Sequence, residues 1–118
     1  PIKAAAVVGG ISDMLLVCKN RPRMKKMLEN ELIGTDREEY LKRSAVCWPG
    51  KLTAPLLIMH GSEDWRSDVA QATVLAAKLD TQDYDYRLEV IDGGDHGLNT
   101  KRAQRNKLIF DWFSEHLD

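Results

Sequence analysis

The chain of 118 residues is 43% hydrophobic and 30% charged, a composition typical of one small folded domain, or part of one, and not of a disordered segment. Its formal net charge of −1 gives no electrostatic reason to expect a nucleic-acid partner. No apolar run approaches the roughly 20 residues that cross a bilayer, so we expect no membrane partner and predict a soluble chain.

The two cysteines, Cys18 and Cys47, are too few for a disulfide framework and lack the spacing of metal ligands. We therefore predict buried or half-buried free thiols in a reducing compartment, which favours a cytoplasmic location. No metal or organic cofactor is implied. The sequence begins at Pro1, directly before an apolar run and without an initiator methionine or signal peptide, so we interpret it as a piece of a longer protein.

The first half of the chain is predicted to contain one strand and a group of short helices. Residues 4–8 are an apolar run followed by two glycines, which indicates a strand buried on both faces. Residues 12–53 then form a helical excursion that could cap a cleft. Its apolar residues keep helical spacing, Pro22 divides the first part into two short helices, and Thr35-Asp36-Arg37-Glu38 has the form of a capping box.

The second half is predicted to alternate strands and helices. Residues 55–59 and 86–91 are the next two strands, and Ser67 and Asp68 can cap the helix between them. The alternation predicts an α/β fold with three mainly parallel strands and right-handed crossovers. A last helix, from about residue 101 to 116, is expected to bury Ile109, Phe110, Phe113 and Leu117.

Acidic and imidazole side chains follow two of the predicted strands. Asp64 comes soon after the second strand, and His96 comes soon after the third. Because parallel strands end at the same edge of a sheet, the two loops should meet there. A carboxylate at that edge can orient a histidine, fix its tautomer and stabilise its protonated form. On these residues alone, a helix-capping Asp64 and an ordinary surface-loop His96 remain an equal alternative.

Two motifs resemble those of one enzyme family. Residues 54–64, Ala-Pro-Leu-Leu-Ile-Met-His-Gly-Ser-Glu-Asp, look like the segment around the triad acid of prolyl-oligopeptidase-like hydrolases: an apolar strand, His-Gly, two residues and the catalytic Asp. Residues 93–97, Gly-Gly-Asp-His-Gly, resemble the Gly-x-x-His-Gly of that family's triad histidine. The match spans nearly the whole chain in the right order. Residues 1–118 are therefore identified as the C-terminal half of an α/β-hydrolase catalytic domain.

The resemblance implies a serine hydrolase that acts on a peptide or ester substrate. It makes Asp64 the orienting acid and His96 the general base, in the chain order of that fold. Trp65 could flank the substrate cleft, and a half-exposed packing role is an equal alternative. The family usually has a valine at the position of Ser67, and a serine there is expected to loosen the packing beneath the loop.

Three other polar residues are given non-catalytic interpretations. Asp68 is a weaker candidate for the acid and is expected to cap a helix. His60 is expected to be a structural residue, hydrogen-bonded near the edge of the sheet. His116 falls in the last turn of a helix, where a cation is favoured by the helix dipole.

The sequence contains no Gly-x-Ser-x-Gly. The nearest segment, around Ser12, lacks the second glycine and lies where the family has the next strand. The chain is therefore expected to supply the acid and the histidine but not the serine, and to be inactive when isolated. The unpaired edge of its sheet is expected to favour self-association or pairing with the missing N-terminal half. The alternative is a small, non-enzymatic α/β binding module that retains the hydrolase pattern.

Overall fold

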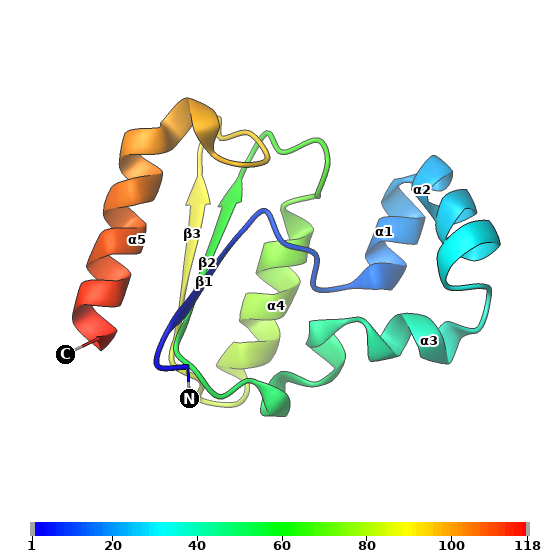
Figure 1. Cartoon of the computed structure of the whole chain (residues 1–118), viewed down its shortest axis with the longest axis horizontal. Coiled ribbons are helices and arrows are strands. Elements are labelled where there is room, and N and C mark those ends of the chain that lie inside the picture. Colours follow the sequence, from blue (N-terminus) through cyan, green and yellow to red (C-terminus); the bar gives the residue numbers. More distant parts are fainter. Residues whose placement is uncertain (1, 118) are drawn as a thin grey trace.

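The structure, a computed structural model, describes residues 2–117 and has three parallel strands with helices on both faces (Figure 1). The strands are β1 (Ala5–Val8), β2 (Leu56–Gly61) and β3 (Tyr86–Ile91), hydrogen-bonded in the order β1-β2-β3. The sequence predicted all three strands and their direction, and the α/β prediction is confirmed. All three strands point to the same edge of the sheet, from which the loops of the candidate site emerge.

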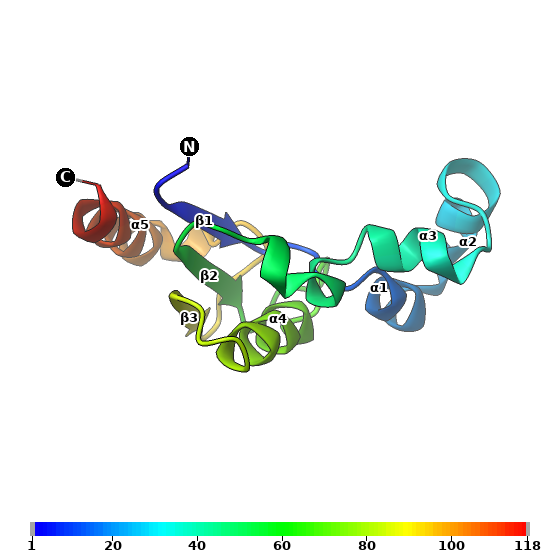
Figure 2. The ribbon, with the colours of Figure 1, turned by 90° about the horizontal axis from the view of Figure 1, so that it is seen from below.

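The two long helices cover opposite faces of the sheet (Figure 2). Leu57 and Met59 of β2 belong to a core cluster with α5 (Arg102–His116). Ile58, between them, packs into a second cluster with α4 (Ala70–Asp80). Because neighbouring side chains of a strand point to opposite faces, the apolar run in β2 supplies both cores.

The prediction for the apolar face of α5 was wrong at two positions. The buried residue is Trp112, at 5% exposed, whereas Phe110 is 71% exposed and Leu117 is 46% exposed. Phe110 lies two residues from Trp112, which places it about 200° around the helix and away from the sheet. Leu117 lies beyond the helix end, where it caps the last turn. Ile109 and Phe113 are partly buried against the core, on the same side as Trp112.

Strand β1 lies at an edge of the sheet and is half-buried, not buried on both faces as predicted. The backbone N–H of Ala5 donates to Pro55 O at 2.9 Å, and that of Gly9 donates to Met59 O at 3.0 Å. Since hydrogen-bonding directions alternate along a strand, the N–H groups of Ala6 and Val8 face away from β2. Within residues 2–117 no strand pairs with this side of β1.

The helical excursion projects sideways from the sheet (Figures 1 and 2). Its helices are α1 (Met14–Asn20), α2 (Pro22–Met27) and α3 (Arg37–Lys42), with a π-helical turn at Leu28–Leu32. Pro22 starts α2, which confirms the predicted division. The cap of α3 is Asp36, whose carboxylate accepts the Glu38 N–H, and not Thr35, the first residue of the predicted capping box. Short 3₁₀ turns occur at Ala45–Cys47, Pro49–Lys51 and Asn99–Lys101.

A buried glutamine on α4 holds the first end of the excursion, to which the returning chain is then bonded. Gln71 Oε1 accepts the backbone N–H groups of Ser12 and Asp13, at 2.9 and 2.8 Å, and its Nε2 donates to Asp13 O at 2.9 Å. The returning chain is held there too, because the Val46 N–H donates to Ser12 O at 3.1 Å. The excursion is therefore fixed to the sheet domain at its base; the idea that it caps a cleft stays a prediction.

Both cysteines are free, but their environments differ from the prediction in one case. Cys18 is partly buried, and burial, with the nearby Glu29 carboxylate, raises the pKa of its thiol. Cys47 is exposed, because it lies in the 3₁₀ turn Ala45–Cys47 on the surface. Across the described residues, no helix combines the length and the apolar character needed to span a membrane.

Candidate active site

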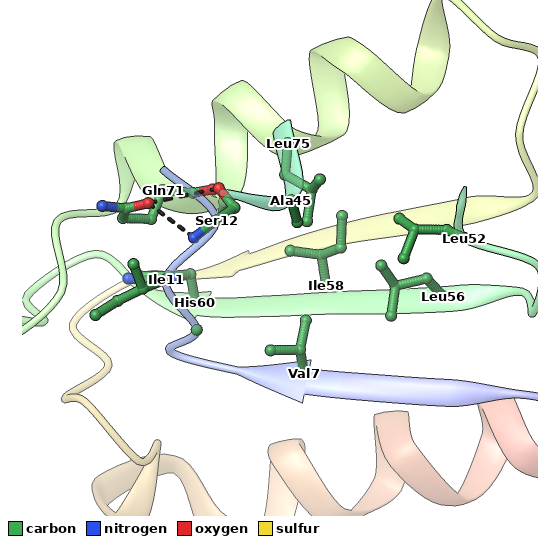
Figure 3. A pocket seen from close by; sticks show the side chains of 12 residues that line it. Val7, Ile11, Ser12, Ala45, Leu52, Leu56, Ile58, His60, Gln71 and Leu75 are labelled. Atoms are coloured by element: carbon green, nitrogen blue, oxygen red, sulfur yellow. Dashed lines mark hydrogen bonds between the residues drawn. The ribbon is translucent and has the colours of Figure 1, made fainter. Parts of the chain in front are cut away.

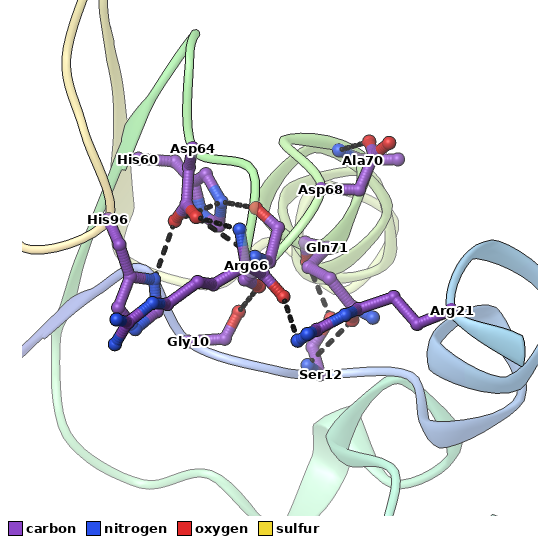
Figure 4. Close-up of polar contacts among 11 residues, drawn as sticks. Gly10, Ser12, Arg21, His60, Asp64, Arg66, Asp68, Ala70, Gln71 and His96 are labelled. Carbon is purple, nitrogen blue, oxygen red and sulfur yellow. Dashed lines mark hydrogen bonds and ion pairs between the residues drawn. The ribbon is translucent and has the colours of Figure 1, made fainter. Parts of the chain in front are cut away.

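The loop after β2, called the acid loop, folds around the carboxylate of Asp64. Asp64 follows β2 by three residues, and its Oδ1 accepts the backbone N–H groups of Arg66 and Ser67, both at 2.9 Å. Such side-chain to backbone bonds are what make aspartate a common turn residue. They use one carboxylate oxygen fully and leave Oδ2 facing the neighbouring loop (Figure 4).

The structure brings Asp64 and His96 together, as the strand topology predicted. His96 Nδ1 lies 2.8 Å from Asp64 Oδ2 (Figure 4). The aspartate side chain is fully buried, while the histidine side chain is 41% exposed. An ionised carboxylate can only accept, so Nδ1 carries a proton, and in the neutral form of the ring Nε2 has a free lone pair. This arrangement places a partly exposed imidazole against a buried carboxylate that sets its tautomer.

The acid is ionised in this environment. Burial of the Asp64 carboxylate raises its pKa, but the N–H of Ser67, the His96 ring and the N–H of Arg66 together outweigh that effect. The pKa of Asp64 is therefore lowered below its ordinary value. Hydrogen bonds to the charged form are the dominant stabilising cause.

His60 is buried and hydrogen-bonded near the edge of the sheet, as predicted. Its side chain is 1% exposed, and its Nε2 lies 2.7 Å from Ser67 O and 3.3 Å from Asp64 Oδ2. Ser67 makes three hydrogen bonds. Its N–H donates to Asp64 Oδ1, and its carbonyl oxygen accepts from His60 Nε2. Its hydroxyl donates to Gly10 O at 3.2 Å. The hydroxyl ties the acid loop to the loop after β1, and the expectation that a serine here loosens the packing stays a prediction.

Gly9, which was predicted only to end a strand, lies directly against Asp64 and His96. Its φ is +63°, and a Cβ at this position would lie 2.5 Å from the His96 carbonyl oxygen and 3.1 Å from Asp64 Oδ2. Gly61 and Gly94 make a similar close approach between the other two loops, since a Cβ on Gly61 would lie 2.1 Å from Gly94 O. The backbones of the loops after β1, β2 and β3 thus lie in close contact around the site.

Trp65 lies directly beside the acid and is 73% exposed, so it does not take the half-exposed packing role. The Arg66 guanidinium lies over its ring, 5.1 Å from the centroid. A cation over an aromatic face is attracted by the ring quadrupole, which favours a defined position for an otherwise exposed side chain. A large flat surface is therefore presented next to Asp64.

The remaining polar candidates lie outside the pair. Asp68 accepts the Ala70 N–H at 2.8 Å, as a helix cap does. His116 lies at the far end of α5, where its Nδ1–H donates to Trp112 O at 2.8 Å. Ser12 is buried, with its hydroxyl donating to Gln71 O at 2.5 Å. In the part of the chain that the structure describes, no serine hydroxyl bonds His96 and no cluster of three or more His, Cys, Asp or Glu side chains could hold a metal ion.

Asp64 should make the fold more sensitive to acid. Its folded pKa is lowered, so its ionisation stabilises the fold at pH values above its unfolded pKa of about 3.9, and this stabilisation is lost as the pH falls through the folded pKa. Urea unfolding from pH 7 to pH 3 should show a stability difference between wild type and Asp64→Asn that shrinks toward low pH. The raised pKa of His116 acts in the opposite sense but is common to both proteins. A pH-independent difference would contradict this prediction.

A model described as the prolyl oligopeptidase family matches residues 2–118. The uncharacterized peptidase YtmA of Bacillus subtilis (strain 168) is 32% identical over 74 residues, covering 60% of this chain and 29% of that protein. The uncharacterized peptidase YuxL of the same organism is 30% identical over 95 residues, covering 76% of this chain and 14% of that protein. The chain thus spans less than a third of the length of these relatives.

Solved structures show the same fold. The uncomplexed acylaminoacyl peptidase of Pyrococcus horikoshii matches with a TM-score of 0.87 and 26% identity over 98% of this chain and 20% of that one. A puromycin-hydrolyzing peptidase of Mycobacterium tuberculosis matches with a TM-score of 0.85 and 21% identity, over 98% of this chain and 18% of its own. The family match covers all but the first residue, and the fold agrees with it along the whole described length. The chain therefore belongs to the prolyl oligopeptidase family, of whose α/β-hydrolase domain it is a C-terminal part.

Proposed function

We propose that this chain is the acid- and histidine-bearing part of a serine peptidase or esterase, in which Asp64 orients His96 and His96 is the general base. One observation carries the proposal: the 2.8 Å contact between a buried, ionised carboxylate and a partly exposed imidazole at the carboxyl edge of a parallel sheet. That edge is where such folds bind ligands.

In this proposal a serine on a segment outside these 118 residues is the nucleophile. His96 Nε2 takes the serine proton as the oxygen attacks the substrate carbonyl, and gives it to the leaving amine or alcohol as the acyl-serine forms. Water then repeats the attack, and the same nitrogen moves its proton to the serine. Asp64 remains ionised throughout and stabilises the imidazolium.

The names of the relatives favour peptides over simple esters as substrates, since two are peptidases by sequence and two by structure. Trp65 is proposed to flank the substrate cleft, because it is exposed and adjacent to the acid. Its indole face suits an apolar or aromatic group of the substrate. The free thiols of Cys18 and Cys47 support a reducing, cytoplasmic compartment.

The test compares the pure 118-residue chain with a longer polypeptide that contains it together with the serine-bearing segment. The longer polypeptide should hydrolyse an activated ester and a peptide amide, and a serine-directed reagent should abolish both activities. The 118-residue chain should show neither. The variant His96→Gln of the longer polypeptide should be inactive yet folded by circular dichroism. Reagent-sensitive turnover by the pure short chain, or full activity of His96→Gln, would refute the proposal.

The open side of β1 is proposed to be the place where the rest of the enzyme pairs with this chain. An apolar cavity of about 180 Å³ lies between the sheet and α4 beside this edge (Figure 3). Its wall includes Val7 of β1, Ile58 of β2 and Leu75 of α4. An unpaired strand next to uncovered apolar surface is a template for association. In the absence of the other half, a second copy is proposed to use the same edge.

We therefore expect the isolated chain to self-associate, with a mass that rises with concentration in light scattering. Ala6→Pro should weaken this association, because it removes an N–H that faces the open edge while leaving the bonds to β2. Ala6→Ser, which keeps that N–H, is the matched control. A wild-type chain that stays monomeric at working concentration would count against the proposal.

A further inference from the structure

The loop that carries His96 is held by backbone hydrogen bonds on both sides of the histidine, and after it also by a side chain. Before the histidine, backbone bonds hold the chain: the Gly94 N–H donates to Ile91 O at 3.0 Å, and Gly94 O accepts the Glu63 N–H at 3.0 Å. After the histidine, the Leu98 N–H donates to Asp95 O at 3.2 Å, and the Gly97 carbonyl is held by a side chain. Nη1 of Arg105 lies 3.1 Å from Gly97 O, although Arg105 belongs to the first turns of α5.

The same guanidinium nitrogen fixes a second point of the loop. It lies 3.2 Å from Asn99 Oδ1, so one side chain spans both ends of the short segment that follows His96. Arginine suits this task because its planar guanidinium offers several donors in a fixed arrangement and stays charged at any working pH. Arg105 itself is partly buried, which limits competition from water.

The segment between these two points is strained and needs restraint. Leu98 has a φ of +56° and is fully buried in the core cluster that contains Trp112. A left-handed conformation is unfavourable at a residue other than glycine and persists only where the surroundings impose it. Gly97 adds no restraint, because a residue without a Cβ has wide conformational freedom. The burial of Leu98 and its N–H bond to Asp95 O restrain this segment, and Arg105 adds to them by holding the Gly97 carbonyl directly after His96.

We propose that Arg105 is a positioning residue, which keeps the His96 ring aimed at Asp64 by holding the Gly97 carbonyl and the Asn99 side chain. The role of Arg105 in turnover rests on the proposed function, in which His96 is the general base. The effect of Arg105 on the ring does not, since it follows from contacts within this chain. Without Arg105, the Gly97 carbonyl oxygen accepts hydrogen bonds from water instead. The loop then samples orientations in which Nδ1 of His96 no longer faces Asp64.

The first measurement is the tautomer of His96 in the 118-residue chain, read from the imidazole ¹⁵N chemical shifts. Wild type should show a single Nδ1-protonated form, and Arg105→Gln a mixture of tautomers or broadened signals. The matched control is Arg102→Gln, because Arg102 is an exposed arginine of the same helix for which no hydrogen bond or ion pair is found within residues 2–117. His116, at the far end of α5, serves as an internal reference that should not change.

The second measurement uses the longer polypeptide with the serine-bearing segment. Arg105→Gln should lower kcat about tenfold or more with KM nearly unchanged, the pattern of a misplaced catalytic group rather than of weakened substrate binding. Arg105→Lys keeps the charge and one donor and should recover part of the loss. If Arg105→Gln does not fold, the lysine variant replaces it, and a smaller shift of the tautomer in the same direction is expected.

The outcomes separate the two proposals. Arg105→Gln that leaves both the His96 tautomer and kcat at wild-type values, while His96→Gln is inactive, would overturn the positioning role alone. An active His96→Gln would overturn the proposed function, whereas the tautomer measurement would still decide whether Arg105 positions the ring. Arg102→Gln with the same effect as Arg105→Gln would assign the change to the helix and not to the contact with Gly97.

Discussion

Replacing Asp64 with asparagine is expected to lower kcat about 10⁴-fold in the longer polypeptide, with the fold intact. Asparagine Oδ1 can still accept the N–H groups of Arg66 and Ser67, so the loop keeps its turn. The amide nitrogen Nδ2, which replaces Oδ2, is then an NH₂ group facing His96. A donor at that position forces Nδ1 to accept, which moves the ring proton to Nε2. The nitrogen that should take the serine proton is thereby blocked.

Asp68→Asn is the matched control, because Asp68 lies four residues away and its carboxylate accepts the N–H of Ala70, the first residue of α4. It should cost at most about 1 kcal/mol of stability and leave kcat within a few-fold of wild type. Steady-state kinetics on both variants, with circular dichroism to confirm folding, distinguish the two carboxylates. A loss of less than tenfold for Asp64→Asn would show that the orienting acid lies elsewhere.

The sheet and the meeting of Asp64 with His96 could be predicted from the sequence because both follow from general topological rules. Alternating apolar runs and helical spacing define a parallel sheet, and parallel strands deliver their following loops to one edge. The 2.8 Å contact shows that the two side chains meet; their assignment as acid and base came from the family resemblance, because the residues alone left it open. No knowledge of side-chain packing was required at either step.

The supporting residues could not be predicted in this way because their roles depend on tertiary contacts between distant segments. The hydroxyl of Ser67 donates a hydrogen bond to Gly10 O, and Gly10 lies 57 residues earlier in the chain. Arg105 is an ordinary helix residue in the sequence, and only the packing of α5 brings it to Gly97. Phe110 shows the converse error, since the apolar residues of α5 were predicted as a set without choosing which side of the helix meets the sheet.

Gly9→Ala is expected to be the most disruptive small substitution near the site, destabilising the chain by roughly 2–5 kcal/mol. Two costs combine. The positive φ of +63° disfavours any residue with a Cβ, by about 1–2 kcal/mol. The added methyl would also lie 2.5 Å from the His96 carbonyl oxygen and 3.0 Å from His96 Nδ1, and backbone atoms cannot move aside as a flexible side chain can. The histidine loop must shift, and the bond to Asp64 is broken or lengthened.

Gly34→Ala separates these two costs within the same chain. Gly34 also has a positive φ, +90°, but a Cβ there would meet nothing within 4 Å. It should therefore show only the conformational cost of about 1–2 kcal/mol. Urea unfolding of both variants gives the energy of the clash as their difference, and the His96 ¹⁵N shifts show whether the ring has left Asp64. Equal destabilisation, with an undisturbed His96 tautomer in Gly9→Ala, would mean that the three loops can separate without cost. The pair would then be held by its own hydrogen bond and not by the close approach of the backbones beneath it.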